Sequence, residues 1–160
     1  MPGNKIEIKK LIEAQSKKNV IAIQGLGFVG SVMAMVCANA IKGDYLVFGV
    51  DLPTTRGKKI IDSLNNGIFP LVAEDPKIEE LFNRTIKKGN FFATTDVSTF
   101  KFADIIIVDI NLDVEKTNQS SGKLVRFDVD LSNFRNAIQS IGENCKENAL
   151  ILVETTVPPG

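Results

Sequence analysis

The chain has 160 residues, of which 44% are hydrophobic and 24% are charged, and this balance excludes a disordered polypeptide. This length fits a single domain with a sizeable core. Lys and Arg together number 19, as do Asp and Glu, so the formal net charge is zero and a nucleic-acid-binding protein with a basic surface is not expected.

Histidine and cysteine chemistry is not expected either. The chain has no histidine, which removes Ser–His and Cys–His nucleophile pairs and His-ligated metals. Cys37 and Cys145 lack the C-x-x-C spacing, so we predict neither a disulfide framework nor a metal site. The first residues lack the apolar segment of a signal peptide, and no apolar run reaches the ~20 residues that cross a bilayer. We therefore expect a cytoplasmic protein that does not contact a membrane.

The first part of the chain is predicted to alternate helices and strands. Residues 5–18 have apolar positions at helical spacing and predict a short N-terminal helix. The β-branched run 20–24 predicts a buried strand. A helix follows with apolar residues from 29 to 41, and Gly43 is its expected end. Residues 45–50 predict the second strand.

The alternation continues to the end of the chain. Two helices are predicted, one ending near Gly67 and one that Asp75 caps, Pro76 begins and Gly89 ends. After them we expect a strand over 91–93, a very apolar strand over 105–110 at the sheet centre, a polar surface loop over 113–127, a helix that Asp130 caps, and a last strand over 150–153. This order predicts an α/β fold, a doubly wound parallel sheet (Rossmann fold) covered on both faces, in a single domain with a short N-terminal helix.

A glycine-rich motif follows the first strand and opens the next helix. It reads G-x-G-x-x-G, over Gly25, Leu26, Gly27, Phe28, Val29 and Gly30. The first glycine permits a tight turn, the second lets a diphosphate approach the backbone, and the third lets the helix pack on the strand. The N-terminus of the helix adds free N–H groups and a positive dipole end. We therefore expect all six residues to bind a dinucleotide.

An acidic residue at the end of the second strand indicates which dinucleotide. Asp51 lies 21 residues after Gly30, where such motifs place the residue that binds the ribose hydroxyls. A carboxylate accepts hydrogen bonds from these hydroxyls and repels a 2′-phosphate, so NAD is predicted rather than NADP. Arg56, in the loop that follows, could flank the ribose or be an ordinary solvated arginine, and the sequence favours neither.

Polar residues also follow two later strands, at the edge where parallel strands meet a ligand. Asn111, Glu154 and Thr155 are therefore expected to line the nicotinamide side. For Thr155 and its neighbour Thr156, ordinary hydrogen bonding within a turn is an equal alternative. Asp109 interrupts an apolar run, so its carboxylate must be paired or lie at the end of the strand.

Several segments resemble the UDP-glucose/GDP-mannose dehydrogenase family. The resemblance rests on residues 21–30, Val50-Asp51, 64–67 followed by Pro70, 93–96, Ala103-Asp104 and, most distinctively, the closing E-T-T-V-P-P-G over 154–160. It implies that residues 19–160 are the NAD-binding domain of such an enzyme and residues 1–18 a helical extension. Members oxidise the alcohol of a nucleotide sugar to the carboxylate, with two NAD and no release of the aldehyde, in polysaccharide biosynthesis.

The same resemblance implies what the chain lacks. The catalytic cysteine and lysine of the family belong to segments beyond Gly160, so no catalytic residue is expected here. The nucleotide sugar would bind through a C-terminal domain that is absent from the chain, and the full-length protein would form a homo-oligomer. The 160-residue chain is expected to bind NAD without turnover.

One segment departs from the family pattern, and two other functions stay open. The family carries a Thr-Pro turn where this chain has residues 110–114, Ile-Asn-Leu-Asp-Val, so the role of that threonine is not transferred. A stand-alone NAD-binding or regulatory module would share the same fold. A hydroxyacid-type dehydrogenase domain would share the glycine loop, although the ending over 154–160 counts against it.

Overall fold

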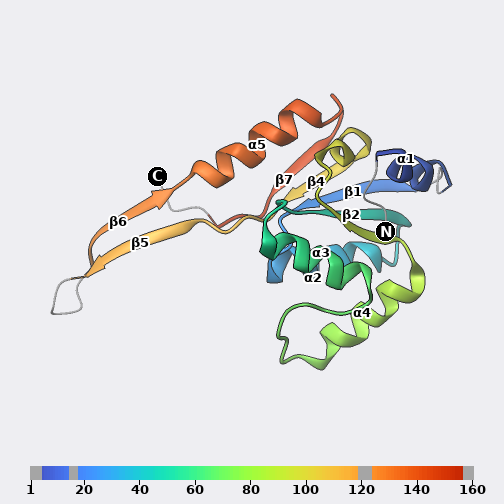
Figure 1. Cartoon of the computed structure of the whole chain (residues 1–160), viewed down its shortest axis with the longest axis horizontal. Coiled ribbons are helices and arrows are strands. Elements are labelled where there is room, and N and C mark those ends of the chain that lie inside the picture. Colours follow the sequence, from blue (N-terminus) through green and yellow to red (C-terminus); the bar gives the residue numbers. More distant parts are fainter. Residues whose placement is uncertain (1–4, 15–17, 119–123, 157–160) are drawn as a thin grey trace.

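The fold is built on a five-stranded parallel sheet. The structure, a computed structural model, describes residues 5–14, 18–118 and 124–156. The strand order is β3-β2-β1-β4-β7 (Figure 1). The strands are β1 (Asn19–Gln24), β2 (Tyr45–Val50), β3 (Phe91–Thr94), β4 (Ile105–Val108) and β7 (Leu150–Val153). This order confirms the predicted doubly wound Rossmann fold.

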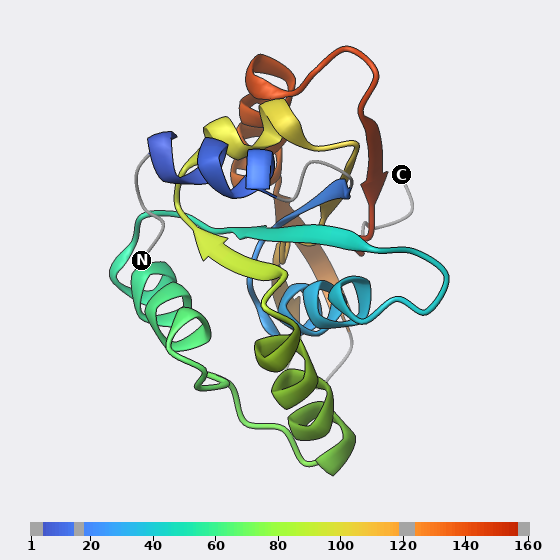
Figure 2. The same ribbon diagram turned by 90° about the vertical axis from the view of Figure 1, so that its right-hand side faces the viewer.

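Helices lie on both faces of the sheet (Figure 2). One face carries α2 (Phe28–Ala38), α3 (Thr55–Asn65) and α4 (Pro76–Lys88), whose apolar residues join one buried cluster. The other face carries α1 (Lys5–Ala14), the 3-10 helix η1 (Val97–Phe102) and α5 (Ser132–Asn144), which share a second cluster. Ile8 of α1 is fully buried there, so the N-terminal helix packs on its own domain. None of the described helices is long and apolar enough to span a membrane.

Local signals placed both ends of α4 correctly, whereas the predicted cap of α5 is wrong, because Asp130 is the last residue of β6 and Leu131 is the N-cap. The Asp75 carboxylate accepts a hydrogen bond from the Lys77 N–H, and Pro76 begins α4. Gly89 ends that helix in the left-handed region with a φ of 63°. The predicted end of α2 at Gly43 is wrong. The helix ends at Ala38 because Asn39 closes its last turn, donating its side-chain N–H to the Met35 carbonyl at 2.9 Å.

The apolar strand predicted over 105–110 is shorter and not central. β4 ends at Val108. The Asp109 N–H still donates to the carbonyl of Gln24, the last residue of β1, but the next N–H, that of Ile110, donates to the Thr155 hydroxyl after β7. The central strand is β1, and β4 lies between β1 and β7.

The predicted surface loop is wrong over residues 113–118 and 124–127, and its remaining residues, 119–123, lie outside the described residues. The structure has a two-stranded antiparallel sheet there, β5 (Asp113–Asn118) and β6 (Leu124–Asp130), with Asp113 opposite Asp130. This hairpin projects away from the main sheet (Figure 1). The prediction of a loop was based on the polar composition of the segment. It overlooked the alternation of apolar and polar residues over 124–130, which is the period of a strand.

The sheet is not covered on both faces along its whole width, as the sequence analysis expected. β7 is an edge strand that pairs only with β4 among the described strands. Its four apolar residues, Leu150, Ile151, Leu152 and Val153, are 39–54% exposed, and none of them joins either described apolar cluster. The domain therefore presents an uncovered apolar edge.

Candidate functional site

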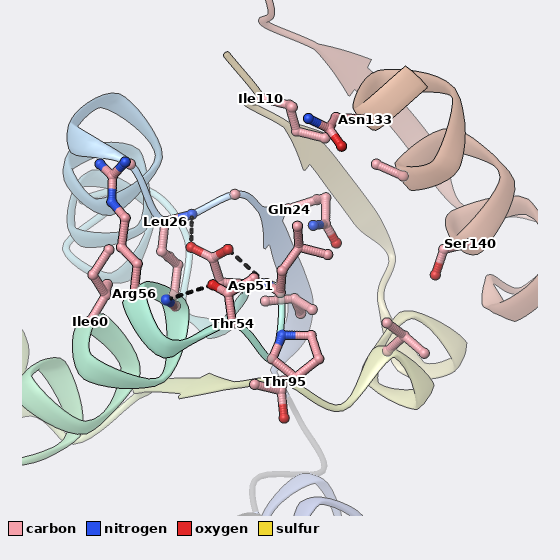
Figure 3. A pocket seen from close by; sticks show the side chains of 18 of the residues that line it. Gln24, Leu26, Asp51, Thr54, Arg56, Ile60, Thr95, Ile110, Asn133 and Ser140 are labelled. Carbon is pink, nitrogen blue, oxygen red and sulfur yellow. Dashed lines mark hydrogen bonds between the residues drawn. The ribbon is translucent and has the colours of Figure 1, made fainter. Parts of the chain in front are cut away.

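A cavity of about 480 Å³ lies at the carboxyl ends of β1 and β2, where ligands bind in doubly wound folds (Figure 3). Six residues expected at the cofactor site line it: Gly25, Leu26, Gly27, Asp51, Arg56 and Asn111. The other five, Phe28, Val29, Gly30, Glu154 and Thr155, are not part of its wall.

The three glycines of the motif have different surroundings. Gly25 has a φ of +99°, and a Cβ there would lie 2.1 Å from the Asp109 carbonyl oxygen. A Cβ on Gly30 would lie 2.0 Å from the Gly25 carbonyl oxygen. Both residues must be glycine for the loop to close. A Cβ on Gly27 would meet nothing within 4 Å, so the space beside this residue is open to a ligand.

The N-terminus of α2 opens onto the same space. Gly27 is its N-cap, and no side chain caps it in the described part of the chain, so the first-turn N–H groups need another acceptor. Phe28 and Val29 are 45% and 56% exposed, and their backbone N–H groups belong to this helix N-terminus although neither residue lines the cavity. Open space beside an uncapped helix N-terminus fits a diphosphate, as the glycine motif predicts.

Asp51 is held in place by two backbone groups. Its Oδ2 accepts from the Leu26 N–H at 3.0 Å and its Oδ1 from the Leu52 N–H at 2.6 Å (Figure 3). The Leu26 side chain is itself fully buried. Since each carboxylate oxygen can accept a further bond, Asp51 can still bind ribose hydroxyls.

Arg56 lies in the first turn of α3, on the side of the cavity next to Asp51. The Thr54 hydroxyl caps this helix by accepting from the Gly57 N–H at 3.0 Å. Arg56 is exposed and has no salt bridge with another described residue. Its place on the cavity wall fits the ribose alternative, and its exposure fits the alternative of an ordinary solvated arginine.

Residues after β4 and β7 divide between the cavity and the framework. Asn111 lines the cavity, whereas Glu154 and Thr155 lie outside its wall. The buried Thr155 hydroxyl accepts from the Ile110 N–H at 3.1 Å and donates to the Val108 carbonyl at 3.4 Å. These bonds join the ends of β4 and β7, which supports the structural alternative for Thr155.

Asp109 lies at the end of β4 and faces the glycine loop. Its Oδ2 would lie 3.2 Å from a Cβ on Gly30, near the N-terminus of α2. Burial raises the pKa of the Asp109 carboxyl, and the nearby negative charge of Glu154 raises it further. Asp109 is therefore an acidic group beside the glycine loop, outside the cavity wall, with a raised pKa.

One wall of the cavity was not expected from the sequence. It consists of residues from α5: Asn133, Asn136, Ala137 and Ser140. Thr95 and Val97, after β3, line the cavity as well. The polar α5 residues recur at helical spacing, a signal present in the sequence, but only the packing of α5 on the sheet brings them opposite Asp51.

Metal or thiol chemistry finds no support among the residues that the structure describes. They contain no cluster of three His, Cys, Asp or Glu residues that could hold a metal ion. Burial raises the pKa of the Cys37 thiol, and this side chain packs against the α2–α4 cluster. Cys37 is thus a half-buried side chain at the edge of this cluster.

The comparison with known families agrees with this geometry. The family model described as "UDP-glucose/GDP-mannose dehydrogenase family, NAD binding domain" matches residues 19–160. The chain belongs to this family. It is therefore an NAD-binding domain, and the resemblance noted in the sequence is confirmed.

The relatives of this family member are longer proteins. UDP-N-acetyl-D-mannosamine dehydrogenase of Pyrococcus horikoshii is 27% identical over 140 residues, which are 88% of this chain and 29% of the relative. The enzyme of the same name from Methanococcus aeolicus is 30% identical over 94% of this chain and 30% of the relative. UDP-glucose 6-dehydrogenase TuaD of Bacillus subtilis is 26% identical over 88% of this chain and 27% of the relative. The chain thus spans less than a third of these relatives.

Two solved structures of nucleotide-sugar dehydrogenases superpose on this chain. NDP-N-acetyl-D-galactosaminuronic acid dehydrogenase of Methanosarcina mazei superposes with a TM-score of 0.73 at 27% identity, over 96% of this chain and 30% of that one. UDP-D-ManNAc dehydrogenase of Pyrococcus horikoshii gives 0.67 at 26% identity, over 88% and 29%. The 3-hydroxybutyryl-CoA dehydrogenase of Escherichia coli, at 20% identity and a TM-score of 0.51, shares the fold alone.

Proposed function

We propose that this chain is the cofactor domain of an enzyme that oxidises the alcohol of a nucleotide sugar to the carboxylate with two NAD. The observation that carries the proposal is the junction of β1 and α2. There Gly27 leaves open space beside an uncapped helix N-terminus, and Asp51 is fixed at the end of the neighbouring strand. These are the groups that a diphosphate and an unphosphorylated ribose require.

The stoichiometry follows from the chemistry of the reaction. Oxidation of a primary alcohol to a carboxylate removes four electrons as two hydrides, and water supplies the second oxygen. NAD, when bound, supplies the hydride acceptor, and the protein supplies binding and orientation. We assign the diphosphate to the loop from Gly25 to Gly30, the ribose to Asp51 and Arg56, and the nicotinamide side to Asn111, with Glu154 and Thr155 behind it. We assign no catalytic residue to this chain.

The names of the relatives from Pyrococcus, Methanococcus and Bacillus support a nucleotide sugar, and specifically a UDP-sugar, as the substrate. The relatives are longer than this chain, which supports a separate substrate-binding domain that this chain does not contain and that would be its partner. We also propose a cytoplasmic homo-oligomer for the complete enzyme. The uncovered β7 edge favours this over a stand-alone NAD-binding module, because such a module would need no apolar surface at the edge of its sheet.

Calorimetric titration of the 160-residue chain with NAD⁺ and NADP⁺ tests this function. We expect NAD⁺ to bind more tightly, because the Asp51 carboxylate repels a 2′-phosphate. Replacement of Asp51 by Asn should weaken NAD⁺ binding roughly tenfold, since hydrogen bonds to a charged group contribute about 1.5–3 kcal/mol. The same change should improve the relative affinity for NADP⁺.

A matched control uses another aspartate outside the cavity. Asp62→Asn, on α3, should leave both affinities unchanged. An NAD⁺ to NADP⁺ ratio that Asp51→Asn does not change would contradict the assignment of Asp51. Steady NADH production by the chain alone with a UDP-sugar would contradict the division between cofactor and substrate domains.

A further inference from the structure

The cavity wall formed by α5 is polar, in contrast to the other sides of that helix. Asn133, Asn136, Ala137 and Ser140 occupy positions i, i+3, i+4 and i+7, so they share one face of α5. A different side of the helix, with Phe134, Ile138 and Ile141, packs into the apolar cluster beneath the sheet. The polar row therefore faces the cavity because the apolar row is fixed in the core.

The side chains of this row make no hydrogen bonds of their own within the described part of the chain. Elsewhere the amides of Asn39, Asn65 and Asn90 all bond to backbone or side-chain partners. Asn and Ser are also less favourable in a helix than Ala, Leu, Glu or Lys. Asn133 and Asn136 are exposed and Ser140 is half-buried, so the polar groups of these side chains are accessible to a ligand in the cavity.

The row lies on the far side of the cavity from the ribose-binding residue. Figure 3 shows Asp51 in the middle, Asn133 beside Ile110 at one end and Ser140 farther along α5. A dinucleotide whose diphosphate lies on the glycine loop and whose ribose lies on Asp51 extends its base into the remaining space. Apolar Leu52, Pro53 and Val97 line that space, and Ala137 leaves room beside Asn136.

We propose that Asn136 recognises the base of the dinucleotide and selects adenine. This inference rests on the proposed NAD-binding function. An asparagine amide presents one acceptor and one donor side by side, which matches the amino group and N7 of adenine. The apolar residues contact the faces of the ring. Asp51 and Arg56 are the charged residues lining the cavity, and both lie at the ribose position, so the base end suits a neutral ring.

Nicotinamide hypoxanthine dinucleotide provides the test, because it differs from NAD only in the base. Hypoxanthine carries an oxygen in place of the amino group, so the edge that faces Asn136 has two acceptors. Whichever way the Asn136 amide is turned, its oxygen then faces an acceptor of hypoxanthine, and one of the two hydrogen bonds is lost. In calorimetric titrations we expect the chain to bind NAD⁺ roughly tenfold more tightly than the hypoxanthine dinucleotide, in keeping with a two-bond amide–base pair.

Asn136→Leu keeps the size of the side chain and removes both hydrogen bonds. It should lower the affinity for NAD⁺ roughly tenfold, leave that for the hypoxanthine dinucleotide nearly unchanged, and so abolish the discrimination. The matched control is Gln139→Leu, which removes an amide from the same helix outside the cavity wall. This control should retain the discrimination. Circular dichroism checks that both variants fold.

The outcomes separate this inference from the function on which it rests. If the unaltered chain binds both dinucleotides equally, or if Asn136→Leu weakens both equally, base recognition by Asn136 is overturned while NAD binding stands. If the folded chain binds neither dinucleotide, the proposed function fails and base recognition fails with it. Loss of discrimination in Asn136→Leu, with discrimination kept in Gln139→Leu, supports the inference.

Discussion

The three motif glycines make separable contributions, which single methyl groups can measure. Gly27→Ala should lower the unfolding free energy by less than about 1 kcal/mol, because its Cβ meets no described atom and alanine is only a poorer helix cap. The same methyl occupies the space assigned to the diphosphate. We expect NAD⁺ affinity to fall roughly tenfold or more, since forced overpacking costs about 1–3 kcal/mol. Calorimetry and urea denaturation measure the two effects.

Gly30→Ala is the matched change. Its Cβ would approach the Gly25 carbonyl oxygen to 2.0 Å, so we expect a loss of about 3 kcal/mol in unfolding free energy. If Gly27→Ala destabilised the fold as much as Gly30→Ala, the open space beside Gly27 would not exist in solution.

The raised pKa of Asp109 makes the stability of the fold depend on pH. A carboxyl with a raised pKa in the folded state binds its proton more tightly than in the unfolded chain, where an Asp titrates near about 3.9. Its favourable contribution is complete below that pH and is lost as the pH rises through the higher folded value. Asp109→Asn should therefore be more stable than the unaltered chain at neutral pH, with a smaller difference at low pH.

Denaturation of both proteins at several pH values measures this difference. Asp62→Asn, at an exposed aspartate of α3, is the control and should follow the unaltered chain. An Asp109→Asn variant that is less stable at neutral pH would mean that the carboxylate makes a favourable interaction.

The sequence was sufficient for residues whose role depends on the local backbone. Gly25 and Asp51 were predicted because a strand, a tight turn and a helix follow one another within 30 residues. Asn136 was not predicted to line the site. It lies 85 residues after Asp51 in the sequence, and only the packing of α5 on the sheet brings both residues to the same cavity. Thr155 was left open, and only the pairing of β4 with β7 shows that its hydroxyl joins two strand ends.

At the scale of elements, the β5–β6 hairpin should be the least protected regular structure. An isolated two-stranded hairpin is marginally stable in water, and this one projects from the sheet (Figure 1). In hydrogen exchange, we expect its amides to exchange at least roughly a hundredfold faster than those of β1 and β4, which open only with the whole domain. Equal protection of the hairpin and β1 would show that another surface covers it.

The helices and strands also show which sequence signals predict secondary structure reliably. Asp75, Pro76 and Gly89 mark the ends of α4 through backbone geometry that does not depend on the rest of the chain. The hairpin was missed because polar composition outweighed a short alternation. The uncovered edge was missed for a different reason: the apolar run of β7 reads like a buried strand whether or not another surface covers it.

At the scale of the whole molecule, the β7 edge should make the isolated chain self-associate. Exposed apolar edge strands pair with other edges. Leu152→Lys places a charge on this strand, where the native side chain is 39% exposed, and should lower concentration-dependent association. Light scattering over a concentration series measures it.

The control for that change is Ile41→Lys, which replaces an isolated apolar side chain that is 99% exposed and lies away from the edge. It should not reduce association, because scattered apolar residues on a surface are ordinary. If Ile41→Lys reduced association as much as Leu152→Lys does, the β7 edge would not be the surface through which the chains associate.

The close approach of Gly30 to Gly25 has a consequence for recognising such domains in other genomes. A descendant that no longer used its dinucleotide would still need both residues, because without them the first turn after β1 cannot close. Their persistence would therefore record a folding constraint. Only the middle glycine of the motif, where an added Cβ would meet no described atom within 4 Å, would be free to change, and its loss would mark the lineages that had abandoned the coenzyme.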